Sequence, residues 1–125
     1  MILRLKTSKE TQEIFAKIGQ TTGLQPYALS KLAISMSINS KDRLTENDFL
    51  TNNDGLDLNR QTICGEYDSL ISILIANYEQ IKLDEDTIFP KYFKAHIDRG
   101  AKLLLNEYKY DKNFYSHLAN LNESI

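Results

Sequence analysis

A wide apolar face between residues 62 and 82 constrains the fold more than any other feature of the chain. Its members, which recur at helical spacing, are Ile63, Tyr67, Leu70, Ile71, Leu74, Ile75 and Tyr78. A helix with such a broad apolar stripe has to bury it against other elements. The sequence therefore predicts a central helix from about Thr62 to Lys82, with the rest of the chain packed around it.

Helical spacing also covers most of the chain on either side of this stretch. A first helix is expected to close at Gly23, where a glycine suits a helix end. A second helix is expected to begin at Pro26, since proline suits the first helical turn, and to end near Asn39. Two further helices are expected over about residues 89–108 and 112–121. The predicted fold class is mainly α, a helical bundle.

The chain opens with a short alternating segment that indicates a β-strand. Leu3 and Leu5 point to one side, and Arg4 and Lys6 point to the other. A strand and two helices within residues 1–38 have the outline of a ribbon-helix-helix unit, in which two protomers pair their strands and outward side chains enter the major groove of DNA. A strand needs a partner, and we expect the rest of this chain to supply none. The alternative is a segment that packs on the bundle and leaves its cations in water.

The remaining organisation is that of one domain. A length of 125 residues suits a single hydrophobic core. Residues 39–61 are rich in Asn, Asp, Ser and Thr, which predicts a long loop with one helical turn near Thr45–Leu50. We expect a single domain over residues 1–125, with a strand–helix–helix part at 1–38, this loop, and a helical part at 62–121.

Charge is unevenly spread along a chain whose formal net charge is only −2. Residues 1–43 carry seven Lys or Arg against three acids, and residues 44–90 carry two against ten. Residues 91–125 return to a net charge of about +2, with six bases against four acids. A basic end beside an acidic middle fits head-to-tail self-association, and it also fits a basic face presented to nucleic acid.

The sequence carries no signal for a membrane or for export. No apolar stretch approaches the length of a membrane span, and the segment Ile2–Leu5 does not begin a signal peptide. We therefore expect a cytoplasmic protein that does not contact a membrane.

Few residues could carry catalysis. Cys64 and His96 fall on adjacent predicted helices, where Glu66 or Asp68 could orient the imidazole ring. A cysteine near a helix start is more often a small core residue, so we expect no catalytic pair. The two histidines stand 21 residues apart without the spacing of a metal site, and no glycine-rich phosphate loop occurs. The sequence predicts neither an enzyme nor a bound metal or cofactor.

Two polar motifs are denser than folding alone requires. The first, residues 59–68, places an arginine, amides, a thiol and two acids at the start of the predicted central helix. The second, residues 96–100, contains Arg99, which could hold phosphate or pair with Glu66 or Asp68. We favour the pairing, which would clasp two helices together. The expected clasp residues are Asn59, Arg60, Gly65, Glu66, Asp68, His96, Arg99 and Gly100.

Cations outside the two motifs are better candidates for contacting DNA phosphate, because no carboxylate is expected to neutralise them. The expected DNA contacts are Arg4, Lys6, Lys9, Lys17, Lys31, Lys41, Lys91, Lys94 and Lys102. These positions come from charge and spacing alone.

The chain resembles the DNA sulfur modification protein family DndE in both motifs. The matching residues are Asn59-Arg60-x-Thr62-x-x-Gly65-Glu66-Tyr67-Asp68 and, about 28 residues later, His96-Ile97-x-Arg99-Gly100. The opening strand and helix pair also look like the start of that family, so the resemblance covers essentially the whole chain.

This resemblance implies a place in a bacterial system that replaces a non-bridging phosphate oxygen of DNA with sulfur. Partner proteins of that system supply a cysteine desulfurase, an iron–sulfur protein and an ATPase. The DndE family is the small member of that system, and it is associated with binding duplex or nicked DNA and with forming tetramers. The resemblance therefore implies a non-catalytic, oligomeric, DNA-binding accessory protein of DNA phosphorothioation. Two alternatives stay open: a ribbon-helix-helix-like sequence-specific repressor, and a protein–protein scaffold of the modification complex without direct DNA contact.

Overall fold

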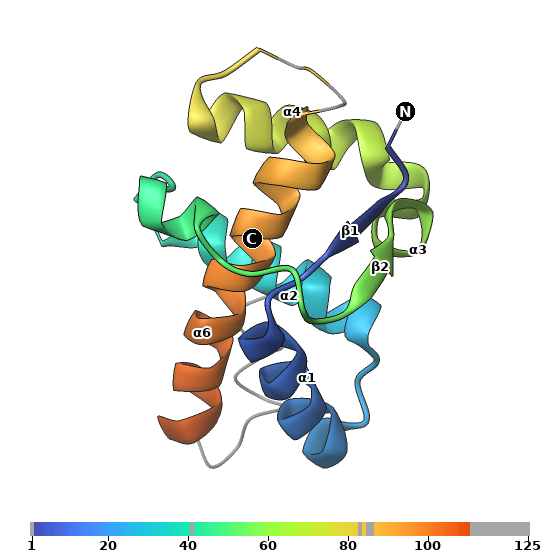
Figure 1. Ribbon diagram of the computed structural model, residues 1–125, viewed down its shortest axis with the longest axis vertical. Coiled ribbons are helices and arrows are strands. Elements are labelled where there is room, and N and C mark those ends of the chain that lie inside the picture. Colours follow the sequence, from blue (N-terminus) through green and yellow to red (C-terminus); the bar gives the residue numbers. More distant parts are fainter. Residues whose placement is uncertain (1, 41, 83, 85–86, 111–125) are drawn as a thin grey trace.

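The computed structural model describes residues 2–40, 42–82, 84 and 87–110. Its elements in chain order are β1 (Arg4–Lys6), α1 (Lys9–Thr22), α2 (Pro26–Asn39), a 3₁₀ turn (Glu46–Phe49), β2 (Asp57–Asn59), α3 (Arg60–Cys64), a second 3₁₀ turn (Gly65–Tyr67), α4 (Asp68–Glu79), a π-helical segment (Ile88–Phe93) and α6 (Lys94–Tyr110) (Figure 1). The predicted mainly α fold with a short N-terminal strand is confirmed. The predicted helix over 112–121 lies outside the described residues.

The centre of the molecule is α6. Figure 1 shows the π-helical segment and α6 following one another along the molecule, with α4 across the π-helical segment and α1 beside α6. The helix α6 packs most extensively on α2 and then on α1. Ile97, Ala101 and Leu104 are fully buried at helical spacing along α6, and Phe93, the last residue of the π-helical segment before it, extends the same stripe. This stripe forms the middle of the hydrophobic core.

The prediction of one central helix over 62–82 is wrong. Gly65 adopts φ 54° and ψ −134°, a backbone conformation that favours glycine. It ends α3 and begins the 3₁₀ turn that precedes α4, so the predicted helix is broken there. The helix α4 ends at Glu79. Its side chains Leu70 and Leu74 remain 53% and 49% exposed, so this apolar face is only partly used in the core.

The first strand finds its partner within the chain, which corrects the expectation that none exists. β1 and β2 pair antiparallel, with Leu5 opposite Leu58 and both side chains buried (Figure 1). The pairing continues where the backbone N–H of Arg60 donates to the carbonyl of Leu3 at 2.8 Å. The strand therefore completes a two-stranded sheet on the bundle without a second protomer.

The helix ends and the first turn of the loop follow local signals in the sequence. Gly23 closes α1 in the left-handed conformation with φ 76°, and Pro26 opens α2, as predicted. The predicted turn within Thr45–Leu50 is confirmed as a 3₁₀ turn whose start is capped by Thr45 and Asp48. In the ranges that the structure describes, no helix has both the length and the apolar character needed to cross a membrane.

Candidate nucleic-acid interface

The first motif is held together by bonds between its own residues. The side chain of Asn59 caps α3 by accepting the N–H groups of Gln61 at 2.9 Å and Thr62 at 3.2 Å. Arg60, whose side chain is only 2% exposed, donates to both carboxylate oxygens of Asp68 at 2.6 and 2.7 Å. Because Asp68 begins α4, this bidentate pair joins α3 to α4 across the Gly65 kink.

Arg60 also connects the motif to the segment that precedes α6. Its guanidinium carbon lies 5.2 Å from the ring centroid of Phe89, which is fully buried. The first motif thus stabilises one end of the bundle, where α3, α4 and the π-helical segment meet.

The second motif joins α6 to α2. Arg99 donates from Nε to Ser37 Oγ and from Nη2 to the Ser37 carbonyl, both at 2.8 Å. His96 Nδ1 lies 2.7 Å from the same hydroxyl. At Gly100 the helices cross so closely that a Cβ atom would lie 1.7 Å from the carbonyl oxygen of Ala33. A glycine at this position is therefore a packing requirement.

The two motifs do not clasp each other, and this expectation is wrong. Arg99 lies 3.9 Å from Asp48 instead of pairing with Glu66 or Asp68. Glu66 is exposed, and Asp68 is engaged by Arg60. The motifs stabilise two separate junctions of the fold.

His96 is a neutral, buried link between α6 and the end of α4. Its Nε2 lies 3.1 Å from a carboxylate oxygen of Glu79, without the alignment of a hydrogen bond. Because Ser37 Oγ accepts from Arg99, its own hydrogen can go to His96 Nδ1, which places the ring proton on Nε2, the nitrogen nearer Glu79. This arrangement holds the imidazole in one orientation.

Burial shifts the pKa values of both His96 and Glu79 toward the uncharged forms of the two side chains. Burial, helped by the Arg99 charge and opposed by Asp48, lowers the pKa of His96 to about 4. Burial also raises the pKa of Glu79, although the hydrogen bond from the Leu44 N–H opposes the shift. An imidazole that is uncharged and fully buried does not present a cation to DNA.

Cys64 behaves as a small core residue. Burial, together with the charge of Asp68, raises the pKa of its thiol to about 12, so the thiolate nucleophile is not formed near neutral pH. No group of three or more His, Cys, Asp or Glu side chains in the described part of the chain could hold a metal ion.

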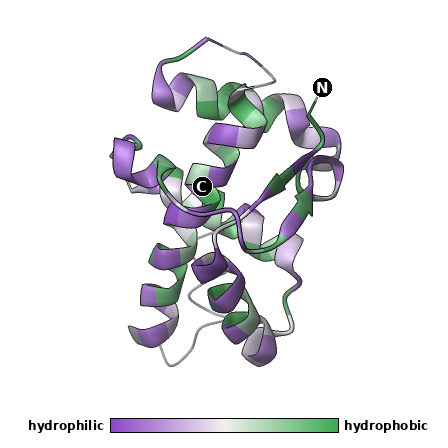
Figure 2. Cartoon of the chain, in the orientation of Figure 1, coloured by the Kyte–Doolittle hydropathy of each residue, from purple (hydrophilic) through white to green (hydrophobic). Residues whose placement is uncertain are grey.

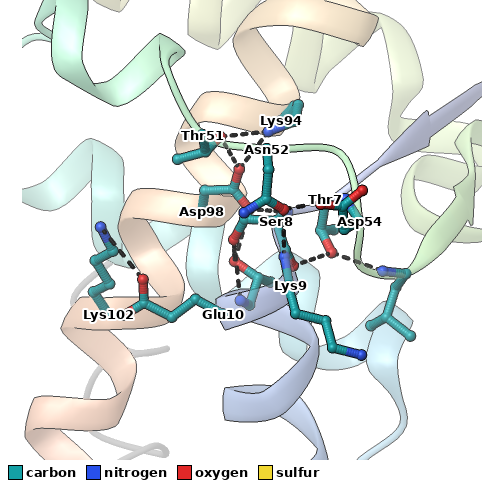
Figure 3. A network of polar contacts seen from close by, with 12 residues as sticks. Thr7, Ser8, Lys9, Glu10, Thr51, Asn52, Asp54, Lys94, Asp98 and Lys102 are labelled. Atoms are coloured by element: carbon teal, nitrogen blue, oxygen red, sulfur yellow. Dashed lines mark hydrogen bonds and ion pairs between the residues drawn. The ribbon is translucent and has the colours of Figure 1, made fainter.

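Lys94 is part of a buried polar network and is not available to DNA, which corrects its place among the expected contacts. Its side chain is 12% exposed and lies 2.7 Å from Asp98, which is itself buried (Figure 3). Asp98 also accepts the N–H of Ser8 at 3.1 Å and the hydroxyls of Thr11 at 2.7 Å and Thr51 at 2.6 Å. The network ties α6 to the start of α1 and to the long loop. Sequence reasoning overlooked Asp98, although its four-residue spacing from Lys94 was a signal.

The other expected cations are exposed and distributed over several elements. They are Arg4 and Lys6 on β1, Lys9 and Lys17 on α1, Lys31 on α2, Lys91 on the π-helical segment and Lys102 on α6. Arg4 lies 3.3 Å from Asp57 and Lys102 lies 3.8 Å from Glu10, in exposed pairs that are energetically weak. Lys41 lies outside the described residues.

One exposed aromatic ring lies near exposed cations. Tyr27, in the first turn of α2, is 44% exposed, and Lys31 Nζ lies 5.8 Å from its ring centroid. Arg4 and Tyr27 line the same shallow pocket of about 210 Å³. We call Arg4, Tyr27 and Lys31 the Tyr27 patch.

A larger apolar groove lies between α2 and α4 and follows α4 from Leu70 to Tyr78. It has a volume of about 760 Å³ and is lined by apolar side chains that include Ile34, Ile38, Tyr67, Leu70 and Leu74. Hydrophobic residues recur along α4 in Figure 2. We call this feature the α2–α4 groove. It is apolar surface that the described fold leaves uncovered.

The fold and these sites define a small, mainly helical domain whose two polar motifs serve its own packing while its surface keeps several cations. Residues 4–112 match the family described as DNA sulphur modification protein DndE. The chain belongs to the DndE family, which acts in DNA phosphorothioation, and the resemblance to that family is confirmed.

Two solved structures share the fold. One is DndE from Escherichia coli B7A, involved in DNA phosphorothioation modification, which is 23% identical and aligns over 83% of this chain and 98% of that chain with a TM-score of 0.65. The other is a glycine-to-lysine mutant of DndE, 22% identical over 85% of this chain and 99% of that chain, also with a TM-score of 0.65. Among curated proteins no significant match is found.

Proposed function

We propose that this protein is a non-catalytic accessory of DNA phosphorothioation that binds duplex or nicked DNA and acts in the cytoplasm with other proteins of that system. The observation that carries the proposal is family membership combined with cations that stay exposed while the polar motifs are used inside the fold. Phosphate would replace the weak carboxylate contacts of these cations, so affinity would come from the DNA backbone with little base readout.

The non-catalytic part of the proposal is supported by the state of the two most reactive side chains. The thiol of Cys64 is protonated and buried, and His96 is buried between Ser37 and Glu79. Neither group is placed to meet a DNA backbone at the surface.

Self-association is the second part of the proposal, with a second copy of the chain covering the α2–α4 groove. Tyr67, Leu70 and Leu74 are each about half exposed beside it, and removing such residues from water favours association. The basic residues 1–43 and the acidic residues 44–90 give two copies complementary charges. An oligomer, such as a tetramer, would also gather several modest cation surfaces on one particle, offsetting the negative net charge.

Charge reversal tests the DNA-binding part. The variant K9E/K17E should weaken duplex binding about tenfold or more, because two phosphate contacts become repulsive. The matched control K82E/K109E makes the same change in net charge at two exposed lysines outside the expected contacts. Equal losses in the two variants would show that net charge, and not these positions, controls binding.

Solution mass tests the self-association part. Leu70→Lys should reduce the mass measured by sedimentation to that of a monomer, because it places a charge in the α2–α4 groove. Leu50→Lys is the matched control, since Leu50 is even more exposed but does not line the groove. A normal oligomer with Leu70→Lys would contradict this use of the groove.

A protein–protein scaffold without DNA contact is the second candidate, and the exposed groove is the observation that favours it. It would be supported if K9E/K17E left the binding of partner proteins and modification activity intact. The repressor alternative has weaker support, because β1 pairs with β2 and Arg4 lies beside Asp57. Equal affinity for unrelated DNA sequences would exclude it.

A further inference from the structure

We propose that the Tyr27 patch binds a DNA nucleotide whose base has left the double-helical stack. Binding at this position rests on the proposed function, because it adds a subsite to a surface that binds DNA. The ligand class is a nucleotide in a single-stranded gap, an overhang or a displaced strand.

The patch is built from two elements of the fold. Tyr27 and Lys31 are one turn apart on α2, and Arg4 comes from β1. Arg4 and Tyr27 line one pocket, and the Lys31 ammonium faces the Tyr27 ring. An exposed ring thus has the Lys31 ammonium over it and shares a pocket with Arg4, whose guanidinium lies 3.3 Å from Asp57.

The ring is available to a ligand. Lys31 Nζ lies 5.8 Å from the ring centroid, close to the outer limit of about 6 Å for a cation–π contact. Both side chains are exposed, so the contact is weak and can open. A planar base could take the ring face while Lys31 turns to the adjacent phosphate.

The chemistry of the patch matches one nucleotide. Aromatic rings bind bases by stacking, and arginine and lysine bind the flanking phosphates. The pocket of about 210 Å³ is smaller than the roughly 300–1,000 Å³ that is usual for small-molecule sites, which suits a single planar group. The pocket is also lined by Asp57, which pairs with Arg4, and by Asn59, whose side-chain oxygen caps α3. Phosphate has to displace Asp57 from Arg4, and the exposed partners of that pair make it weak.

A base inside an intact duplex cannot use this ring, because its faces are covered by the neighbouring base pairs. Only an unstacked base offers a free face. The subsite should therefore add affinity for DNA with single-stranded character and add little for intact duplex.

Among the described residues, a second strongly exposed tyrosine provides a contrast. Tyr67 is 56% exposed but lines the apolar α2–α4 groove, whereas Tyr27 lies beside Arg4 and Lys31. Tyr67→Ala is therefore a matched control that removes the same side chain from a surface of different chemistry.

The experiment compares affinity for an intact duplex with affinity for the same duplex carrying a short single-stranded gap. The full chain and its Tyr27→Ala, Tyr27→Phe and Tyr67→Ala variants are measured, and a 2-aminopurine in the gap reports stacking by its fluorescence. Tyr27→Ala should lower gapped-duplex affinity about tenfold, leave intact-duplex affinity nearly unchanged, and abolish the quenching of 2-aminopurine. Tyr27→Phe and Tyr67→Ala should keep the wild-type ratio of the two affinities.

An unchanged ratio and unchanged quenching in Tyr27→Ala would overturn this inference while leaving DNA binding intact. An equal loss for both DNA forms would also overturn it, since Tyr27 would then act only as a general contact. If the wild-type chain bound neither DNA, the proposed function itself would fail, and the subsite with it.

Discussion

The helices α6 and α4 both carry apolar residues at helical spacing, yet they lie in different surroundings. Along α6, Ile97, Ala101 and Leu104 are fully buried. Along α4, Leu70 and Leu74 are about half exposed, and the buried residues of that helix are Ser72, Ile75 and Ala76. The longer and more central helix, α6, is also the one that carries more charged side chains.

The two helices differ in burial because the backbone of α2 packs directly against α6, while no comparable close contact is seen at α4 in the described residues. At Gly100 the backbone of α6 meets that of α2, and His96 and Arg99 fix the crossing through Ser37. The polar contacts of α4 are near its ends, where Asp68 binds Arg60 and Glu79 lies beside His96. Close backbone contact and anchored polar pairs, and not the width of an apolar stripe, determine which helix becomes the core.

The largest expected effect comes from breaking the close crossing of α6. Gly100→Ala should lower the free energy of unfolding by about 4 kcal/mol or more, because the new methyl group would overlap the Ala33 carbonyl. Urea unfolding of the variant and the wild-type chain measures this loss of unfolding free energy. Gly19→Ala is the matched control, since its Cβ would lie 3.1 Å from one backbone oxygen, and it should cost little. Equal stability of the two variants would contradict the importance of the crossing.

The next effect concerns the junction at the start of α4. Arg60→Met should lower the free energy of unfolding by about 3 kcal/mol. The substitution removes the bidentate ion pair and leaves the Asp68 carboxylate without the Arg60 guanidinium. Chemical denaturation should show the loss. Arg4→Met removes an exposed ion pair and should change stability by about 0.5 kcal/mol or less. A small effect of Arg60→Met would mean that the first motif does not hold the junction.

Acid should loosen the junction between α6 and α4. The folded chain keeps His96 neutral because its pKa is about 4, whereas the unfolded chain binds a proton below about 6.5. Stability should therefore fall by about 2 kcal/mol as pH drops from about 6.5 to about 5. The raised pKa of Glu79 acts in the opposite direction, since the folded state then gains protons on acidification. His96→Gln should flatten the fall in unfolding free energy, and an unchanged slope would contradict the assignment.

The smallest effect on stability is expected from the exposed face of α4. Leu70→Ser should change the free energy of unfolding of the monomer by less than about 1 kcal/mol, because the side chain is half exposed. Ile97→Ala on α6 should cost about 2–4 kcal/mol, since it leaves a cavity in the core. Similar losses in the two variants would remove the contrast between the helices.

The parts of the fold that could be predicted depend on local signals. Gly23 and Pro26 mark helix boundaries through their own backbone preferences, and Thr45 with Asp48 marks the capped turn. β2 could not be predicted because a three-residue strand has no pattern of its own, and its partner is more than fifty residues away.

The candidate site shows the same limit. Spacing correctly indicated that Arg60 stands among carboxylates, and Asp68 is its partner. It could not show that Arg99 meets Ser37 and Asp48, since these contacts depend on how α6 crosses α2. Lys94 looked like a surface lysine because its burial comes from the long loop folding over α6.

The central claim is that the exposed cations bind DNA through its phosphates. The most direct test is the affinity for one duplex measured at increasing salt concentrations. The logarithm of the binding constant should fall steeply and linearly with the logarithm of salt concentration, and K9E/K17E should reduce the slope. An affinity that stays flat between low and moderate salt would contradict the claim.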